Sequence, residues 1–514
     1  MERLLADDWT LDPSVFDYKI SFRPAQYAKG LLAESWEFPD PSTMVVHLRK
    51  GILWQNIPPI NGREFIANDV VSHYQRLYGA GSGMTPQPAY VPTVLGTNLK
   101  AVTATDKYTI TFSSKIPNPE VIFEGIQSPS GSSADIEAPD AVKQWGDVSD
   151  WHHAIGTGPF ILQDFISGSS AILIKNPNYW GYDERYPQNK LPYVNALNIL
   201  IIPDDATAMA GVRTGKLDYI EGKTIQDAQA IQNTNPEILQ TIGARLDSIP
   251  TVDPRNDVKP FNDIRVRKAM QMALDLPTIA KSFYQGAVDP WPSTLTSNYM
   301  TGYGFPYNQW PQDLKDEYAY NPTAAKKLLS DAGYPNGFKT NVIAQTDSDL
   351  DLIQVVKSYF AAVGIDMSIS TMDNATWTAY VRAGHKHDQL VFRNIGSLGL
   401  TYDPTHQVSR FMTGYIMNWV IVSDPVFDAL SAKAMASTSA DDMKQVLKDM
   451  NEYVARQHFA ISLLQPASFN LYQPWLNGYN GQNQSGLWNA ADHLVGFYSA
   501  RFWIDQKLKK SMGH

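Results

Sequence analysis

The stretch from residue 321 to 371 constrains the fold most, because helix and strand patterns alternate there with clear stop signals between them. The first helix, "NPTAAKKLLSDAGY", has Asn321 as its cap, Pro322 in its first turn and Gly333 to end it. "KTNVIAQT" then has the composition of a strand, "LDLIQVVKSYFAAVG" that of a second helix, and "IDMSIST" that of a second strand. A strand, a helix and a strand in succession favour parallel pairing, so we predict an α/β architecture for this half of the chain.

The first part of the chain has a different pattern, in which short apolar runs alternate with turns up to about residue 150. One helix is expected there, "NDVVSHYQRLY", with Asn68 or Asp69 as its cap. A hairpin is predicted within "GTGPFILQDFISGSSAILIKNPNYWG", where the apolar runs Phe160–Ile166 and Ala171–Lys175 flank a Ser-Gly-Ser-Ser turn. The following segment, "YVNALNILIIPDDATAMAGVRTGKLDYI", predicts a strand, a helix and a strand.

The composition excludes several classes of protein. The 514 residues carry a net charge of -10, which argues against a nucleic-acid partner, and they include no cysteine, which rules out disulfides and thiolate metal sites. No apolar stretch approaches the roughly 20 residues that span a bilayer, and "MERLLADDWT" lacks the pattern of a secretion signal. We therefore expect either a cytosolic protein or a mature or trimmed chain.

The common sequence patterns of catalytic sites are missing. The chain has no H-E-x-x-H, no G-x-S-x-G and no G-x-x-x-x-G-K-[ST] phosphate loop. The acid pairs Asp204-Asp205 and Asp441-Asp442 stand where helix caps are expected, which accounts for them without catalysis. We predict that the protein is not an enzyme and needs no cofactor, with a hydrolase as the distant alternative.

Several longer motifs follow one another along nearly the whole chain: "LAESWEFPDPSTMVVHLRKGILWQN", "GTGPF" with "NPNYWG" behind it, "GKLDYIEG", "FNDIRVRKAMQMALDLPTIAKSFYQGAV", "YNPTAAKKLLSDAGYPNGF" and "VSDPVFDAL". In this order they resemble the family 5 extracellular solute-binding proteins, which are the peptide, nickel and oligosaccharide receptors of bacterial ABC importers. The resemblance implies a receptor that takes up a solute and delivers it to the permease of an ABC importer. It also implies a monomer that is periplasmic or extracellular and anchored to the membrane.

The resemblance further implies an α/β, two-lobed, periplasmic-binding-protein-like fold of the large family 5 type, with an additional small inserted domain. The first lobe is expected to be discontinuous, over residues 1–36, 157–252 and 470–514. The inserted, β-rich domain is expected at 37–156, and the second α/β lobe at 253–469. In similar proteins the region of "GTGPF" carries the chain back from the inserted domain into the first lobe, so its glycines and prolines are expected to be architectural.

Ligand contacts are implied for the segment "QLVFRNIGSLGLTYDPTHQVSRFMTGYIMNW" of the second lobe. A dipeptide receptor of this family has an aspartate for the ligand's ammonium group where this chain has Leu400, and an arginine for the carboxylate where this chain has the acidic "TDSDLD", ahead of a helix expected to begin near Leu350. A buried ligand charge without a partner is costly, so free dipeptides are disfavoured. An oligopeptide or another small organic solute is predicted; an oligosaccharide stacked on aromatic rings, and then a nickel chelate, remain open.

The predicted ligand-binding residues are aromatic or polar, and Asp403 is expected to be a turn residue instead. They are Trp377, Tyr380, Arg393, Asn394, Tyr402, His406, Asn418 and Trp419 in the second lobe, with Tyr18 and Trp488 in the first.

A metal site is not predicted. His385 and His387 stand two apart in "GHKHD", and a nickel-chelate receptor could use such histidines or His406, but surface histidines in a loop before a strand are the favoured interpretation. The acids Asp347, Asp349 and Asp351 resemble the start of a calcium loop, yet the glycine and the closing glutamate of such a loop are missing.

Overall fold

The computed structural model describes residues 1–12, 15, 25–78, 98–127, 134–244, 250–292, 302–346, 348–393, 410–415, 418–479, 481 and 495–514. The chain divides into two compact units. The first comprises Met1–Gly243 and Ser468–His514, and the second comprises the described residues from Ala244 to Ala467. The three-part division with an inserted domain at 37–156 stays a prediction.

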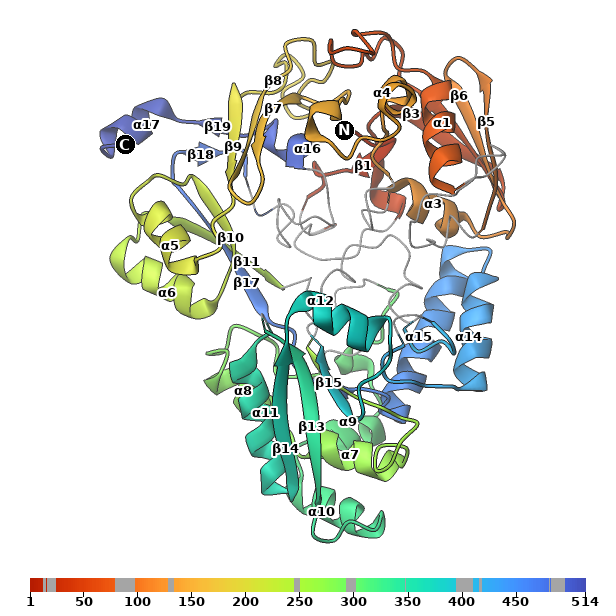
Figure 1. Cartoon of the computed structure of the whole chain (residues 1–514), viewed down its shortest axis with the longest axis vertical. Coiled ribbons are helices and arrows are strands. Elements are labelled where there is room, and N and C mark those ends of the chain that lie inside the picture. Colours follow the sequence, from red (N-terminus) through yellow and green to blue (C-terminus); the bar gives the residue numbers. More distant parts are fainter. Residues whose placement is uncertain are drawn as a thin grey trace. The chain divides into compact units, whose positions relative to one another are not determined.

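The first unit begins with a short pair of strands and a four-stranded antiparallel sheet (Figure 1). β1 (Leu5–Asp7) pairs with β2 (Ala28–Gly30), after the turn η1 (Ala25–Tyr27). The larger sheet has the order β3 (Ala33–Asp40), β4 (Thr43–Leu48), β6 (Thr109–Ser114), β5 (Leu99–Asp106). Every second residue of β4 is buried, as a sheet with one face on the core requires.

Helix α1 (Ala67–Tyr78) packs against β5 and β6 of this sheet, with α3 (Pro119–Gln127), α4 (Pro139–Trp145) and the turn η2 (Trp151–His153) nearby in the chain. The helix begins at Ala67, so the prediction that Asn68 or Asp69 caps it was wrong. Asp69 is buried inside the first turn, where its carboxylate accepts hydrogen bonds from the Ile66 amide and from Arg63. The ion pair between the buried Asp69 and the half-buried Arg63 explains why an acid stands inside the helix.

The predicted hairpin is confirmed. β7 (Phe160–Ile166) pairs antiparallel with β8 (Ser170–Lys175), and Gly168 adopts the positive φ of 70° that the turn requires. β9 (Ala196–Leu200) adds a third strand, and α5 (Asp205–Arg213) and β10 (Tyr219–Lys223) follow in the predicted order. Asp204 caps α5 by accepting a hydrogen bond of 2.7 Å from the Thr207 amide.

The remaining elements of the first unit come from two distant parts of the sequence. α6 (Ile225–Thr234) leads to β11 (Leu239–Ala244), and β17 (Ala467–Tyr472) lies between β10 and β11 in a three-stranded sheet (Figure 1). β18 (Leu476–Asn477) pairs with β19 (Trp503–Ile504), with α16 (Val495–Ser499) before and α17 (Gln506–Ser511) after β19.

The glycines and prolines around the hairpin frame a buried carboxylate, that of Glu2. Its oxygens accept hydrogen bonds from Thr157 Oγ1 (2.7 Å), in "GTGPF", and from the Tyr179 hydroxyl (2.9 Å) and Trp180 Nε1 (3.3 Å), in "NPNYWG". Burial raises the pKa of the Glu2 carboxyl, while these hydrogen bonds act in the opposite direction. Asn176, which follows the hairpin, donates a hydrogen bond of 2.9 Å to the carbonyl of Gly158, which precedes it, and so links the segments on the two sides of the hairpin.

The second unit is built on a five-stranded mixed sheet (Figure 1). Its order is β14 (Ile365–Met372), β13 (Phe338–Gln345), β15 (Leu390–Arg393), β12 (Thr251–Pro254), β16 (Ile461–Ser462). β13 is parallel to both β14 and β15, which confirms the predicted parallel pairing, and β12 runs antiparallel to its neighbours.

Helices cover this sheet and bury a core in which Met270, Leu329, Val342, Phe360 and Met367 pack together. They are α7 (Ile264–Met272), α8 (Leu276–Ser282), α10 (Pro322–Asp331) and α11 (Leu350–Ala362), followed by α12 (Asn374–Trp377) and the π-helix η4 (Thr378–Arg382). A second group consists of η3 (Tyr307–Gln309), α9 (Gln312–Tyr318), α14 (Pro425–Met435) and α15 (Ala440–Gln457).

The ends of two of these helices, α10 and α15, agree with the predictions made from the sequence. Asn321 accepts a hydrogen bond of 3.0 Å from the Ala324 amide, and Gly333 has a φ of 95° where α10 ends. Asp441 and Asp442 lie in the first turn of α15, whose cap is Ser439. Both acid pairs therefore stand at helix starts, as expected.

A buried arginine closes the end of α15. Arg267 donates to the carbonyl oxygens of Phe261 (2.6 Å), Gln457 (2.9 Å) and His458 (3.0 Å). Burial lowers the pKa of its guanidinium to about 10. Two of these carbonyls, those of Gln457 and His458, stand at the end of α15, where the helix supplies no amide partner.

Candidate functional site

The candidate ligand surface lies at the carboxyl edge of the three parallel strands in the second unit. β13, β14 and β15 end at Gln345, Met372 and Arg393, and the register pairs Gln345 with Met372. Thr251 of β12 pairs with Arg393, so the antiparallel strand begins at the same edge. In open α/β sheets, ligands bind outside the carboxyl ends of the strands.

Two tryptophans meet at this edge. Trp377 ends α12, which follows β14, and its ring lies 5.0 Å from that of Trp419 in an edge-to-face arrangement of 87°. They pack with Val381, Val391 and the half-buried Tyr380, and their side chains are only 5% and 8% exposed. The structure therefore brings together three of the predicted residues, Trp377, Tyr380 and Trp419.

A histidine fixes the backbone beside the second tryptophan. His387 Nε2 lies 2.8 Å from the carbonyl oxygen of Trp419, so this nitrogen must carry the proton and donate it. His387 is fully buried, which lowers its pKa to about 4, and the nearby Arg255 acts in the same direction. The expectation of a surface histidine was wrong for His387. Its ring is buried and neutral, and it donates a hydrogen bond to the backbone next to Trp419.

Three buried polar atoms at this edge form no hydrogen bond with any described residue. Trp377 Nε1, Ser348 Oγ and Thr251 Oγ1 are buried and have no hydrogen-bond partner within the part of the chain that the structure describes. Ser348 follows β13 by three residues, and the other two lie beside the ends of β14 and β15. Buried polar groups are seldom left unpaired, so this edge offers one indole donor and two hydroxyls to a further partner.

Asn418 is held by its own loop. Its side-chain amide donates to the carbonyls of Met412 (3.0 Å) and Val422 (2.7 Å), and its oxygen accepts from the Val422 amide (3.0 Å). These three bonds shape the turn that presents Trp419. The predicted contact of Asn418 with a ligand stays a prediction.

The other predicted residues cannot be placed at the site. Arg393 ends β15, but only its backbone belongs to the described residues. Outside the described residues altogether lie Tyr18, Asn394, Tyr402, His406 and Trp488, together with Leu400 and Asp403.

The acids of "TDSDLD" have a structural role where they are described. Asp349 caps α11, which begins at Leu350 as expected, by accepting a hydrogen bond of 2.9 Å from the Leu352 amide. Among the described residues, no three His, Cys, Asp or Glu side chains gather as a metal site would need. The described helices likewise include none with the length and apolar character to cross a bilayer.

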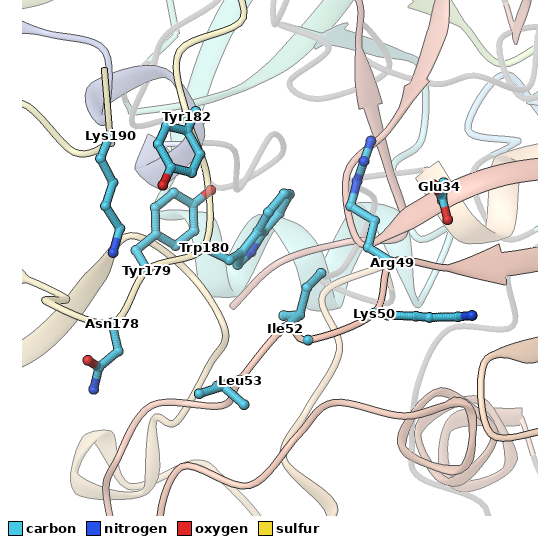
Figure 2. Close-up of a pocket in the computed structure, with 11 residues that line it drawn as sticks. Glu34, Arg49, Lys50, Ile52, Leu53, Asn178, Tyr179, Trp180, Tyr182 and Lys190 are labelled. Atoms are coloured by element: carbon cyan, nitrogen blue, oxygen red, sulfur yellow. The ribbon is translucent and has the colours of Figure 1, made fainter. Parts of the chain in front are cut away.

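A separate pocket of about 770 Å³ lies within the first unit (Figure 2). One side is formed by residues 49–53, which follow β4, and the other by residues between 178 and 190, which follow β8. None of the predicted site residues lines it, and composition or periodicity gave no signal for it.

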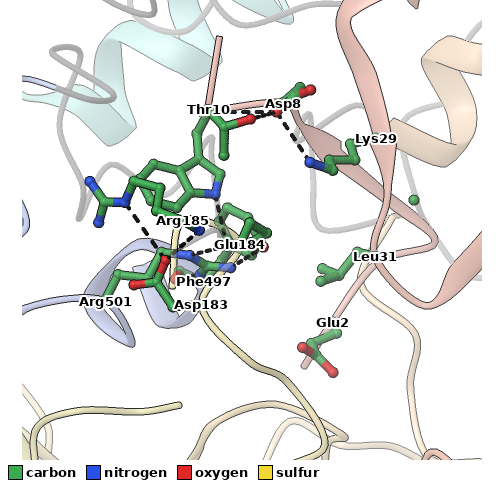
Figure 3. A network of polar contacts seen from close by, with 12 residues as sticks. Glu2, Asp8, Thr10, Lys29, Leu31, Asp183, Glu184, Arg185, Phe497 and Arg501 are labelled. Carbon is green, nitrogen blue, oxygen red and sulfur yellow. Dashed lines mark hydrogen bonds and ion pairs between the residues drawn. The ribbon is translucent and has the colours of Figure 1, made fainter. Parts of the chain in front are cut away.

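A cation–aromatic network joins three segments of the first unit, which contain Trp9, Glu184 with Arg185, and Arg501 (Figure 3). The indole of Trp9 has the guanidinium of Arg185 at 4.1 Å and that of Arg501 at 5.1 Å from its ring centroid. Glu184 accepts hydrogen bonds from Trp9 Nε1 (3.2 Å) and Arg501 Nε (2.9 Å). Three distant parts of the sequence are thereby fixed around one indole ring.

Comparison with known proteins identifies relatives for nearly the whole chain. It is 26% identical over 475 residues to heme-binding protein A of Haemophilus influenzae, which covers 87% of this chain and 81% of the relative. It is 25% identical over 498 residues to the dipeptide-binding protein of Pseudomonas aeruginosa, covering 91% and 86%.

The fold is that of known binding proteins. The structure of the ABC transporter-associated periplasmic binding protein DppA from Helicobacter pylori, in complex with the peptide STSA, matches with a TM-score of 0.74. The match covers 98% of this chain and 95% of that one at 22% identity. A family model described as bacterial extracellular solute-binding proteins, family 5 Middle, matches residues 28–414. The chain therefore belongs to the family 5 bacterial extracellular solute-binding proteins.

Proposed function

We propose that the protein captures an oligopeptide, or a solute that resembles one, at the carboxyl edge of the second unit and delivers it unchanged to an ABC importer. The observation that carries the proposal is the edge-to-face pair of Trp377 and Trp419, in which the indole N–H of Trp377 has no acceptor among the described residues. Aromatic side chains with a few convergent polar groups are typical of small-molecule sites.

The three polar groups of this edge that have no partner among the described residues, the indole of Trp377 and the hydroxyls of Ser348 and Thr251, are neutral, which favours a main chain as the ligand. A peptide carbonyl would accept from Trp377 Nε1, and peptide amides or carbonyls would pair with the hydroxyls of Ser348 and Thr251. Asp349 is occupied as a helix cap. A free dipeptide carries two charged termini close together, and these need charged partners when they are buried.

The arrangement of the rings argues against stacking of a sugar. Trp377 and Trp419 meet edge to face and are almost fully buried, so neither ring presents an open face. The nickel alternative is weakened for His387, because this histidine is fully buried and its Nε2 already donates to a backbone carbonyl. The relatives named above bind heme, dipeptides or peptides, which supports a receptor and leaves the solute to experiment.

The place and partners of the receptor follow from the same proposal. We place it in the periplasm or outside the cell, held at the membrane, as a monomer that meets the permease of its importer. The support is family membership together with a structural relative that is described as periplasmic and transporter-associated.

The proposal is tested by mass spectrometry of the molecules that denaturation releases from the purified protein. We expect unmodified peptides, and we expect tetra-alanine, added to the refolded protein, to raise the melting temperature while di-alanine does not. A shift with di-alanine alone would contradict the exclusion of dipeptides. Hydrolysis of a retained peptide would contradict the receptor itself.

A further inference from the structure

The short loop of residues 418–422, which carries Trp419, is bound to the second unit at two successive carbonyls. His387 Nε2 donates to the carbonyl of Trp419. Asn256 donates to the carbonyl of Val420, from its backbone amide at 2.8 Å and from its side-chain Nδ2 at 3.1 Å. Asn256 lies two residues after β12, and His387 lies three residues before β15, which pairs with β12. The loop is therefore fixed from two neighbouring strands.

The side chain of Asn256 joins this loop to two other parts of the second unit. Besides the carbonyl of Val420, its Nδ2 contacts the carbonyl oxygens of Pro254 at 2.9 Å and Phe459 at 3.0 Å. Pro254 ends β12, and Phe459 follows α15. An asparagine amide carries two N–H donors on one nitrogen, which neither a carboxylate nor an aliphatic side chain of this size can supply. The loop, the strand and the end of the helix thus meet at one amide group.

The same loop contains an unfavourable backbone conformation. Ile421 has a φ of 50°, in the left-handed region where β-branched residues are seldom found. Such a conformation persists only where the surrounding contacts determine it, and it is found most often at functional sites. The Ile421 amide donates to the carbonyl of Asn418 at 3.2 Å, and the three side-chain hydrogen bonds of Asn418 close the loop. Together with Asn256 and His387, these contacts hold the strained turn.

The backbone next to Trp377 is irregular as well. α12, which Asp373 caps, ends at Trp377, and the chain continues as the π-helix η4. In this turn the Ala383 amide donates to the carbonyl of Thr378 at 2.9 Å. π-Helical turns are rare and occur frequently at functional sites. Both rings of the tryptophan pair, 5.0 Å apart, therefore stand beside backbone of an uncommon conformation.

We propose that Asn256 is a positioning residue of the solute site. Its amide holds the strained turn at Ile421 and so keeps the ring of Trp419 against that of Trp377. The inference rests on the proposed solute surface at these two tryptophans. A wall that is ordered before the solute arrives loses less conformational entropy on binding. Without the amide of Asn256 the turn relaxes, the ring of Trp419 gains other orientations, and the solute has to order it.

The test is a double-mutant cycle on the affinity for tetra-alanine, measured by calorimetry with the full chain at a temperature where every variant is folded. Trp419→Ala is expected to weaken binding at least about tenfold, and Asn256→Ala about tenfold. In the Trp419→Ala background, Asn256→Ala should change the affinity by less than about twofold, because the ring through which it acts is absent.

A second measurement follows the tryptophan pair without any solute. Two indoles in contact couple in the far-ultraviolet circular dichroism, and the part of the signal that Trp419→Ala removes belongs to this pair. Asn256→Ala should weaken that part. Asn256→Ser, whose hydroxyl can still donate to one carbonyl, should lie between the parent and Asn256→Ala, and it replaces Asn256→Ala if the latter does not fold.

The matched control is Asn321→Ala, which removes the cap of α10 in the same unit. It exchanges the same two residue types and lowers the stability of the fold, but its side chain does not contact the loop of Trp419. We expect it to keep both the dichroism of the tryptophan pair and the parent's affinity for tetra-alanine.

Three results would overturn the inference: an unchanged affinity of Asn256→Ala, an unchanged dichroism of this variant, or an equal loss of affinity with and without the ring of Trp419. Each would leave Asn256 as a residue that supports the fold only. A different result would overturn the proposed solute surface instead, namely that tetra-alanine does not bind the parent or binds Trp419→Ala as tightly. The dichroism would then still decide whether Asn256 holds the tryptophan pair.

Discussion

The buried His387 is expected to make the second unit sensitive to mild acid. Its pKa is about 4 in the folded protein and 6.5 as its ordinary value, so the unfolded chain takes up the proton first as the pH falls. Stability therefore rises with pH between these two values and is lost as the pH falls through them. The difference in unfolding free energy between about pH 7 and pH 5 amounts to about 2 kcal/mol from this residue alone.

The charged groups around the ring do not cancel the effect. Burial is the largest cause of the low pKa, and Arg255 and His385 add to it, while Asp253 and the carbonyl of Trp419 act in the opposite direction. In His387→Gln, the amide can still donate to the carbonyl of Trp419, but it does not titrate. This variant should therefore lose about 2 kcal/mol less than the parent over the same pH interval.

Hydrogen exchange measured by mass spectrometry on a peptide covering β15 reports this opening free energy locally, without assuming that both units unfold together. Rates are compared after correction for the intrinsic pH dependence of exchange. His385→Gln, two residues away in the same loop, is the control; it removes only one of the smaller contributions to the low pKa of His387, so it should keep most of the parent's pH dependence. If His387→Gln loses as much stability in acid as the parent does, the neutral buried histidine is refuted as the cause.

Three further predictions concern packing and the solute site. Arg267→Met should lower the free energy of unfolding by about 3 kcal/mol or more, because three buried carbonyls lose their donors; thermal unfolding measures it, and Arg265→Met at the exposed face should change little. Trp377→Phe should keep the ring contact but weaken binding of the co-purified solute by about 1 kcal/mol, which calorimetry measures. If the affinity is unchanged, the indole N–H does not contact the solute. Gly337→Ala would put its Cβ 1.8 Å from a backbone carbonyl oxygen, so it should destabilise far more than Gly51→Ala, where no atom lies within 4 Å; equal melting temperatures of the two would contradict this.

Elements with strong local signals could be predicted from the sequence. The cap at Asn321, the stop at Gly333 and the β7–β8 hairpin are set by residues within a few positions of each other. Pairings between distant segments could not be predicted from the sequence, because no local pattern shows that Thr251 pairs with Arg393 or that β17 pairs with β10.

The same limit applies to the site. Trp377, Tyr380 and Trp419 were predicted through the resemblance to a family, and they lie together. The burial of His387 was not predicted, because two histidines in a polar loop carry no periodic pattern that distinguishes a core donor from a surface residue. The aromatic donors to Glu2 belong to the motif "NPNYWG", but their common acceptor lies more than 150 residues away in the chain, so no local pattern indicates it.

The position of β17 has a consequence for how the chain acquires its structure during synthesis. This strand is the middle one of its sheet, and its neighbours β10 and β11 come from more than 220 residues earlier (Figure 1). Until the ribosome has made residues 467–472, β10 and β11 have no strand between them to complete their hydrogen bonds. The sheet of the second unit lies within one continuous stretch, so we expect it to form before β17 joins β10 and β11, and we expect this long-range pairing to be the slow step of folding.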